Sequence, residues 1–114
     1  MRVIVFFDLP MKTPKDLKQY RYFRRFLIKE GFVMMQKSVY SKIALNDTAI
    51  KAVKKRIFDN KPKSGIVEIL TITEKQFNSI EFIVGKKNEQ IVDDDKGIVE
   101  LWNYHIIYLL NQLN

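Results

Sequence analysis

The chain has 114 residues, of which 46% are hydrophobic and 12% aromatic, so its composition predicts one globular domain with a core of its own and excludes a disordered tail. It contains no cysteine, which excludes a disulfide framework and a thiolate metal site and fits a reducing cytoplasm. The formal net charge is +7, and the excess lies in residues 12–30 (net +5) and 46–64 (net +4), so a polyanion is a candidate partner.

The first predicted element is a strand that ends at an acid. Residues 3–7 are all Val, Ile or Phe, and an unbroken run of strand formers is typical of a strand covered on both faces. Alternation along the strand places Asp8 on the same face as Ile4 and Phe6. The question is why a strand built for burial ends in a carboxylate.

Asp8 has two interpretations. As a turn residue, it would bond the backbone of the Asp-Leu-Pro segment and end the strand. As a metal ligand, it would be held rigidly at the strand end. Mg²⁺ in proteins usually takes one or two carboxylates plus waters, so two copies of Asp8 facing each other across a dimer axis would supply the pair.

A helix is predicted from Pro14 to about Glu30. Thr13 is a favoured N-cap, proline is favoured at the first helical position, and Gly31 is a favoured residue just past a helix end. At 100° per residue, one face carries the residues predicted to enter the core. These residues are Leu17, Tyr20, Phe23 and Leu27.

A row of basic residues lies beside this core face, inside an arc of about 80°. Its members are Lys18, Arg21, Arg25 and Lys29, with Tyr22 next to them. At ~1.5 Å per residue the row is about 16 Å long, and DNA carries a charge every ~1.7 Å of its axis, so the row can meet several phosphates. No acid lies inside the arc, which favours phosphate contact over a merely solvated helix face.

Arg24 differs from this row because it falls inside the apolar arc of the same helix. In one interpretation its stem lies along the core and its charged head reaches the surface. In the other, the guanidinium is aimed at a specific partner.

Residues 32–45 are predicted to be extended, as two short strands if the chain breaks around residues 36–38. Val39 and Ile43 alternate with Tyr40, which assigns Tyr40 to the polar face of its strand. There it would line a groove or belong to ordinary sheet surface.

A second helix is predicted after Asn46, which is a favoured N-cap, with an apolar stripe of Ile50, Val53 and Ile57. The basic residues of this helix are spread around it, so we interpret them mostly as solvation. A strand over residues 65–73, a helical turn over 74–78 and a last strand over 82–85 follow.

This element order predicts an α+β fold, the ferredoxin-like βαββαβ sandwich with both helices on one face of an antiparallel sheet. The other face stays apolar, so we expect a homodimer packed through the sheets. No apolar run approaches the ~18 residues of a membrane span, and the first run is too short for a signal peptide, so a cytoplasmic protein with no membrane partner is expected.

The predicted ferredoxin-like domain covers residues 1–85, and residues 86–114 form a C-terminal extension. Residues 88–95 are predicted to be an acidic loop, whose three aspartates lack the alternate spacing of a calcium loop. Residues 97–113 are apolar and fit either a strand or an amphipathic helix. His105, the only histidine, has no neighbours with metal-site spacing.

Three stretches together resemble the CRISPR-associated protein two family, the small adaptation subunit that works with the CRISPR spacer integrase. They are VIVFFDLP (residues 3–10), YRYFRRFLIKEGF (20–32) and QKSVYSKI (36–43). The family pattern is a first strand ending in Asp, a basic first helix, Gly, and then Gln-x-Ser-Val-aromatic. The last two stretches resemble versions encoded beside the single large RNA-guided effector nuclease. Residues 97–114 have no counterpart in shorter members.

The resemblance implies a ferredoxin-like homodimer in which Asp8 of each protomer faces the dimer axis and shares a Mg²⁺. It implies that the dimer bridges two integrase dimers and lies under the duplex to be inserted. It further implies that Arg21, Arg24 and Arg25 touch the DNA backbone, and Tyr40 matches the aromatic after Ser-Val. Residues 86–114 are a candidate for contacting the dimer partner or the integrase.

The first hypothesis is therefore a nucleic-acid-binding protein of CRISPR antiviral defence, which bridges integrase dimers and holds duplex DNA for spacer acquisition. The alternative is a Mg²⁺-dependent endonuclease acting on RNA or DNA through Asp8, although no second acid, histidine or lysine forms a motif with it. The third hypothesis is a regulatory ferredoxin-like module that binds no nucleic acid. This hypothesis leaves the basic row on the first helix unexplained.

Overall fold

The computed structural model describes residues 1–86. Its elements are β1 (Arg2–Asp8), α1 (Pro14–Lys29), β2 (Val33–Gln36), β3 (Val39–Ile43), α2 (Asp47–Asp59), β4 (Ile66–Ile72) and α3 (Glu74–Asn78). The chain divides into two units, Met1–Ile80 and Glu81–Asn114, and all these elements belong to the first. The α+β class and the predicted order of elements up to residue 78 are confirmed.

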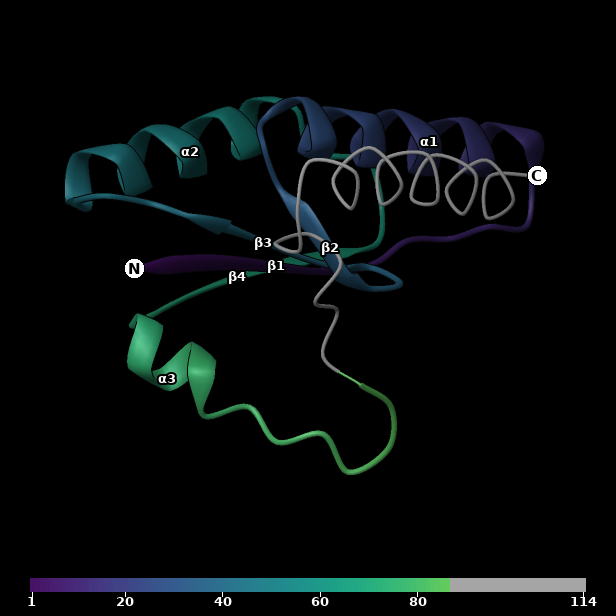
Figure 1. Ribbon diagram of the computed structural model, residues 1–114. Coiled ribbons are helices and arrows are strands. Elements are labelled where there is room, and N and C mark those ends of the chain that lie inside the picture. Colours follow the sequence, from purple (N-terminus) through teal and green to yellow (C-terminus); the bar gives the residue numbers. More distant parts are fainter. Residues whose placement is uncertain (87–114) are drawn as a thin grey trace, which may run out of the picture. The chain divides into compact units, whose positions relative to one another are not determined.

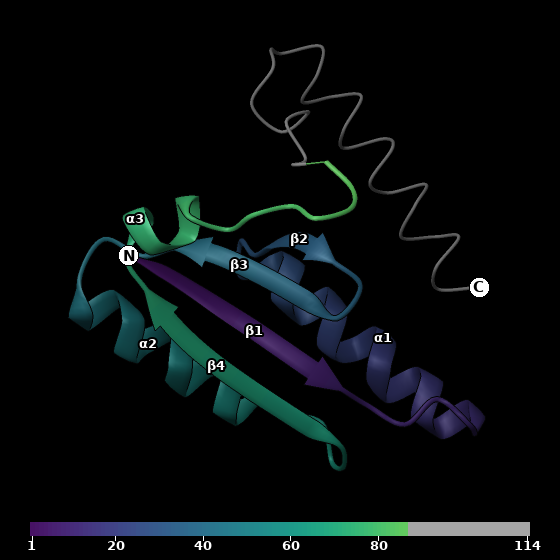
Figure 2. The same ribbon diagram turned by 90° about the horizontal axis from the view of Figure 1, so that it is seen from below.

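The four strands form one antiparallel sheet in the order β2-β3-β1-β4, so β1 lies between β3 and β4. Figure 1 shows α1 and α2 together over one face of this sheet and α3 on its other side. Figure 2 shows the strands from the side of that other face, which α1 and α2 leave open. This is the ferredoxin-like arrangement that the element order predicted.

Local capping residues set the helix boundaries, as expected. Thr13 Oγ accepts from the Asp16 N–H over 3.0 Å, and the Asp16 carboxylate accepts from the Thr13 N–H over 3.1 Å. Asn46 Oδ1 accepts from the Ala49 N–H over 2.8 Å at the start of α2. Such caps satisfy N–H groups that have no partner inside the helix, and each stabilises its helix by about 1 kcal/mol.

The core lies between the sheet and the two long helices. Val3, Val5 and Phe7 of β1 point into it and are nearly or fully buried, together with the predicted stripe of α2. The Phe7 ring lies 5.2 Å from that of Phe23 in an edge-to-face arrangement. Leu17, which we had assigned to the core face of α1, is only half-buried.

The open face of the sheet is apolar, as the sequence indicated. Register places Ile43 of β3 and Leu70 of β4 on this face with Ile4. Ile43, Ile66 and Leu70 are 54%, 57% and 48% exposed, whereas Ile4 on the same face is only 4% exposed and Glu68 lies between Ile66 and Leu70. Large apolar side chains are therefore partly exposed on the face away from α1 and α2.

Arg2 connects β1 to α3. Its Nε lies 2.9 Å from the Glu74 carboxylate, and its guanidinium lies 4.1 Å from the centroid of the Phe77 ring. One side chain therefore fixes the short α3 by an ion pair and a cation–π contact together.

The predicted strand at residues 82–85 is wrong. Residues 83–85 form bends, and no strand of the described chain pairs with residues 82–85. Apolar residues make a strand only where another strand supplies hydrogen bonds. The predictions for residues 88–95, 97–113 and His105 fall outside the described residues. None of the helices that the structure describes is long and apolar enough to cross a membrane.

Candidate metal and nucleic-acid site

Asp8 is the last residue of β1, and its side chain is exposed. Its neighbours Phe7 and Leu9 are each only 6% exposed and belong to the core, so the backbone on both sides of Asp8 is anchored. Within residues 1–86 no hydrogen bond or ion pair engages its carboxylate. Asp8 therefore combines a fixed backbone with a carboxylate that is open to a ligand.

The backbone around Asp8 is held from both neighbouring strands. On one side the Phe7 N–H donates to the Ser38 carbonyl over 3.0 Å, where Ser38 has a positive φ of 66° in the turn between β2 and β3. On the other side Asp8 pairs with Ile66 at the start of β4. The end of β1 is thus a defined position and not a loose chain end.

Asp8 alone offers one carboxylate to a metal ion. Mg²⁺ requires octahedral oxygen coordination and usually takes one or two carboxylates and several waters. Within residues 1–86 no group of three or more His, Asp or Glu side chains is placed to hold a metal ion. An exposed carboxylate without a partner fits Mg²⁺ when a second copy of Asp8 and water complete the coordination.

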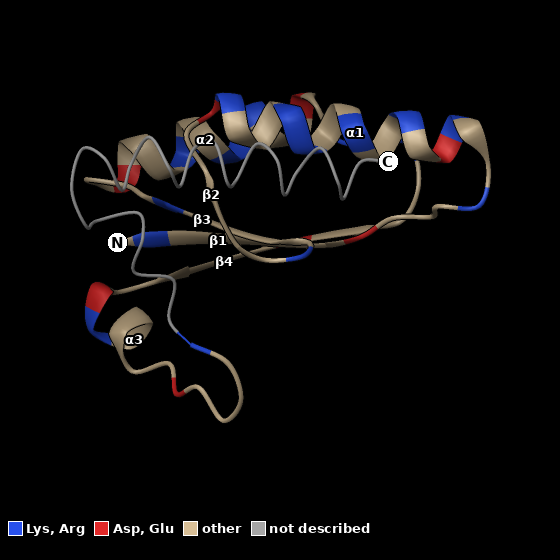
Figure 3. Ribbon diagram, turned by 45° about the vertical axis from the view of Figure 1, so that its right-hand side comes forward, with Lys and Arg blue, Asp and Glu red and all other residues tan. Residues whose placement is uncertain are grey.

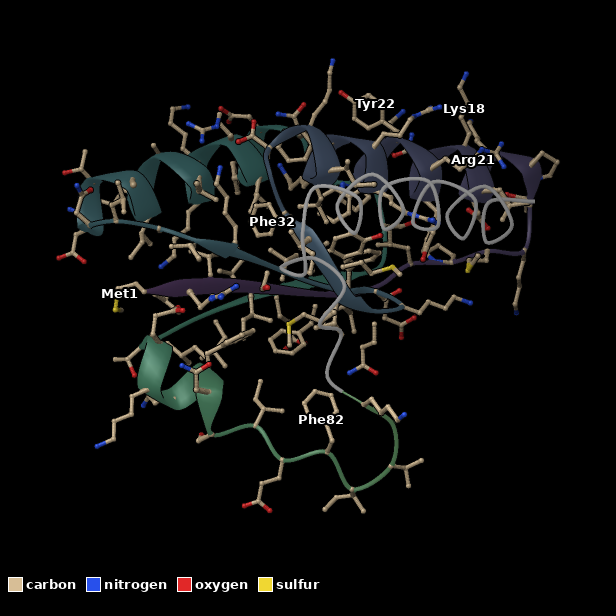
Figure 4. All side chains as sticks on the ribbon, in the orientation of Figure 1. Met1, Lys18, Arg21, Tyr22, Phe32 and Phe82 are labelled. Atoms are coloured by element: carbon tan, nitrogen blue, oxygen red, sulfur yellow. The ribbon has the colours of Figure 1, made fainter. Side chains whose placement is uncertain are left out.

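The basic row on α1, which we call the α1 stripe, consists of Lys18, Arg21, Arg25 and Lys29. Arg21 is half-buried and the other three are exposed. Basic residues recur along α1 in Figure 3, and Figure 4 shows Lys18 and Tyr22 pointing away from the sheet. None of the four cations forms an ion pair within the described chain, so their charges are not neutralised there.

Two of the four basic residues of α2 behave differently, whereas Lys51 and Lys54, like the α1 stripe, form no ion pair within the described chain. Lys55 pairs with Asp59 over 2.9 Å and Arg56 pairs with Glu30 over 2.7 Å. These two cations thus have acidic partners, which agrees with their interpretation as helix solvation. The Tyr22 hydroxyl donates to Asn60 Oδ1 over 3.2 Å and joins the outer face of α1 to the end of α2.

Arg24 does not join the α1 stripe. The residue is 2% exposed, with the guanidinium 5.9 Å from the centroid of the Tyr20 ring. Burial excludes the interpretation in which its charged head reaches the surface. In this arrangement Arg24 presents no surface to a nucleic-acid backbone.

The assignment of Tyr40 to a polar face is wrong. Tyr40 pairs with Val5, so it shares the face of the sheet that α1 and α2 cover, and it is 1% exposed. Val39 and Ile43, which alternate with Tyr40, lie on the open face of the sheet. Both faces of β3 carry large apolar groups, so alternation alone did not tell which face meets the helices.

A hollow of about 620 Å³ lies between the C-terminal half of α2 and β4. Its lining includes Ile57, Phe58, Val67 and Ile69, and Lys61 Nζ lies 3.9 Å from the centroid of the Phe58 ring. Neither Asp8 nor any member of the α1 stripe lines it. The hollow is therefore a separate surface feature.

Sequence reasoning missed Gly65, which packs against the end of β1. A Cβ added to Gly65 would lie 2.6 Å from the Asp8 carbonyl oxygen. The only signal in the sequence was a glycine directly before a strand, which we had counted as the first residue of that strand. Its proximity to Asp8 depends on the pairing of β1 with β4.

The sequence model of the family described as "CRISPR associated protein Cas2" matches residues 1–80, which covers Asp8, the α1 stripe and every described helix and strand. The chain is 50% identical over 101 residues to the "CRISPR-associated endoribonuclease Cas2" of Treponema denticola, which covers 89% of this chain and 100% of that protein. It is 45% identical over 101 residues to the protein of the same name from Streptococcus mutans, over 89% of this chain and 93% of that one.

A solved structure supports the fold independently. The crystal structure of Streptococcus pyogenes Cas2 at pH 6.5 superimposes with a TM-score of 0.57, covering 74% of this chain and 100% of that chain. The sequence identity is 17%, so this similarity concerns the fold alone.

Proposed function

This chain belongs to the Cas2 family of CRISPR-associated proteins, and on that premise we propose that it binds nucleic acid during CRISPR adaptation. In this role it bridges dimers of the CRISPR spacer integrase and holds the duplex DNA that becomes a new spacer. The observation that carries the proposal is the α1 stripe, a row of four cations without acidic partners in the described chain.

The geometry of the α1 stripe suits a phosphate backbone. Lys18 and Lys29 are eleven residues apart on one helix, so the row extends for about 16 Å and passes several phosphates of a duplex. Contacts of this kind fix position and orientation but read no sequence. That property suits a protein that must accept spacers of any sequence.

The homodimer belongs to this proposal. Two copies packed through their open sheet faces would cover Ile43, Ile66 and Leu70, which are about half exposed in a single copy. Since α1 covers the opposite face of the sheet, the α1 stripe of each copy would remain accessible (Figure 1). The integrase is part of this proposal only because the chain resembles a family that works with it.

Duplex binding as a function of salt concentration tests this function. Binding through phosphate contacts releases counterions, so the binding constant should fall steeply as salt rises. A chain with no salt-sensitive binding to duplex DNA would contradict the proposal and favour the regulatory module.

A second candidate function is a Mg²⁺-dependent endoribonuclease. The exposed Asp8 without a partner favours it, and the relatives from Treponema denticola and Streptococcus mutans carry that activity in their names. Asp8 from each of two copies would hold the ion. A bound Mg²⁺ would supply an activated water and offset the negative charge that develops on the phosphate. Cleavage of RNA that depends on both Mg²⁺ and Asp8 is the test.

A further inference from the structure

Gly65 lies in the loop between α2 and β4, where it has a φ of +95°. A Cβ at this position would meet the Asp8 carbonyl oxygen at 2.6 Å, the Leu9 Cδ2 at 2.8 Å and the Leu9 Cα at 3.1 Å. Two of these three neighbours are backbone atoms, which do not turn aside as a flexible side chain does. The loop therefore approaches the end of β1 more closely than any residue with a side chain would permit.

Gly31 provides a comparison within the same chain. It has the same φ of +95°, just past the end of α1, but a Cβ there would meet only the Lys42 side chain, at 3.6 Å from Nζ. At Gly31 the requirement is conformational, because few other residues adopt this φ without strain. At Gly65 the close approach to Asp8 is an additional requirement.

We propose that Gly65 is a positioning residue for Asp8, which sets the place of its carboxylate by allowing the loop to pack against the Asp8 backbone. This inference rests on the proposal that Asp8 binds a divalent cation. Gly65 itself touches no ligand. It acts on the edge of β1 that faces β4, while the Ser38 carbonyl holds the Phe7 N–H on the opposite edge.

A side chain at position 65 would have to displace one of two segments. Either the Asp8 carbonyl moves away, and its carboxylate moves with it, or the loop moves and takes along Ile66, the β4 partner of Asp8. Both movements misplace the carboxylate. Mg²⁺ demands near-ideal octahedral geometry, and loss of groups that orient a metal ligand typically costs about 10- to 100-fold in affinity.

The test is Mn²⁺ binding to the purified full chain, measured by isothermal titration and by the electron paramagnetic resonance of free Mn²⁺. The variants are Gly65→Ala, the matched control Gly31→Ala and Asp8→Ala. Gly65→Ala should weaken Mn²⁺ binding about 10- to 100-fold, with the oligomeric state unchanged. Gly31→Ala introduces the same residue at the same φ and should keep the affinity of the wild type.

Gly65→Asn and Gly31→Asn form a second pair in case alanine unfolds the chain, because asparagine tolerates positive φ better but still carries a Cβ. Wild-type affinity in a folded Gly65 variant, or an equal loss in the Gly31 variants, would overturn the inference. The inference would also be overturned if both Gly65 variants failed to fold, or failed to keep the oligomeric state of the wild type, while the two Gly31 variants succeeded. Gly65 would then be required by the fold as a whole and not by the position of Asp8. Wild-type Mn²⁺ affinity in Asp8→Ala would instead refute the metal role of Asp8, and the inference with it.

Discussion

The aromatic rings of Phe7 and Tyr40 stack with their centroids 5.7 Å apart and their planes at 25°, one residue before β1 ends at Asp8. Phe7 faces the core and Asp8 faces away from it, so the anchor and the carboxylate are consecutive residues of one strand. The candidate site is thus built directly on the aromatic core.

Tyr40→Ala should destabilise the fold strongly, because it removes a buried ring and leaves a cavity beside Phe7. We expect a loss of about 3–5 kcal/mol in the free energy of unfolding, measured by urea denaturation. Tyr22→Ala is the control, since Tyr22 is 53% exposed and should cost only about 1 kcal/mol. Equal effects at both positions would contradict the placement of Tyr40 in the core.

Charge reversal in the α1 stripe should weaken duplex binding. In the variant Arg21→Glu/Arg25→Glu, loss of two phosphate contacts should reduce the slope of log K against log salt by about 2. Fluorescence anisotropy of a labelled duplex at several salt concentrations measures this slope. Lys51→Glu/Lys54→Glu on α2 changes the net charge equally and should alter the slope less. Equal slopes for the two double variants would mean that only overall charge matters.

Asp8→Asn should abolish Mg²⁺-dependent cleavage of RNA while leaving duplex binding unchanged. The substitution removes the negative charge of the side chain but keeps its shape. The measurement is cleavage of a labelled RNA with and without Mg²⁺. Asp59→Asn removes an exposed acid that already pairs with Lys55 and should cleave as the wild type does. Cleavage by Asp8→Asn at the wild-type rate would assign the activity to another site or to a contaminant.

Arg2→Ala should detach α3 at a modest cost. The ion pair with Glu74 is partly exposed, and together with the contact to Phe77 it should contribute roughly 1 kcal/mol to the free energy of unfolding. Lys55→Ala removes a more exposed ion pair, with side chains 76% and 51% accessible, and should cost at most about 0.5 kcal/mol. Urea denaturation that ranks the two variants in the opposite order would contradict this.

Much of the fold was predictable because its signals are local. Thr13 and Asn46 cap their helices through side-chain contacts with residues three positions away. Asp8 at the end of β1 was also predictable, since an unbroken apolar run ends there. The position of the α1 stripe followed from helical periodicity alone.

The features that sequence reasoning missed depend on contacts between distant segments. Tyr40 enters the core because β3 pairs with β1 in a register that only the folded sheet defines. The role of Gly65 depends on its approach to Asp8, which is 57 positions away in the sequence. The strand predicted at residues 82–85 failed because a strand requires a partner that the described chain does not provide.

The most direct test of the central claim is the yield of spacer integration in vitro, with the partner integrase, duplex DNA and Mg²⁺. The wild type and Lys51→Glu/Lys54→Glu should support integration, whereas Arg21→Glu/Arg25→Glu, verified to be folded and to keep the oligomeric state of the wild type, should not. Integration at the wild-type yield by Arg21→Glu/Arg25→Glu would contradict the claim that the α1 stripe holds the DNA.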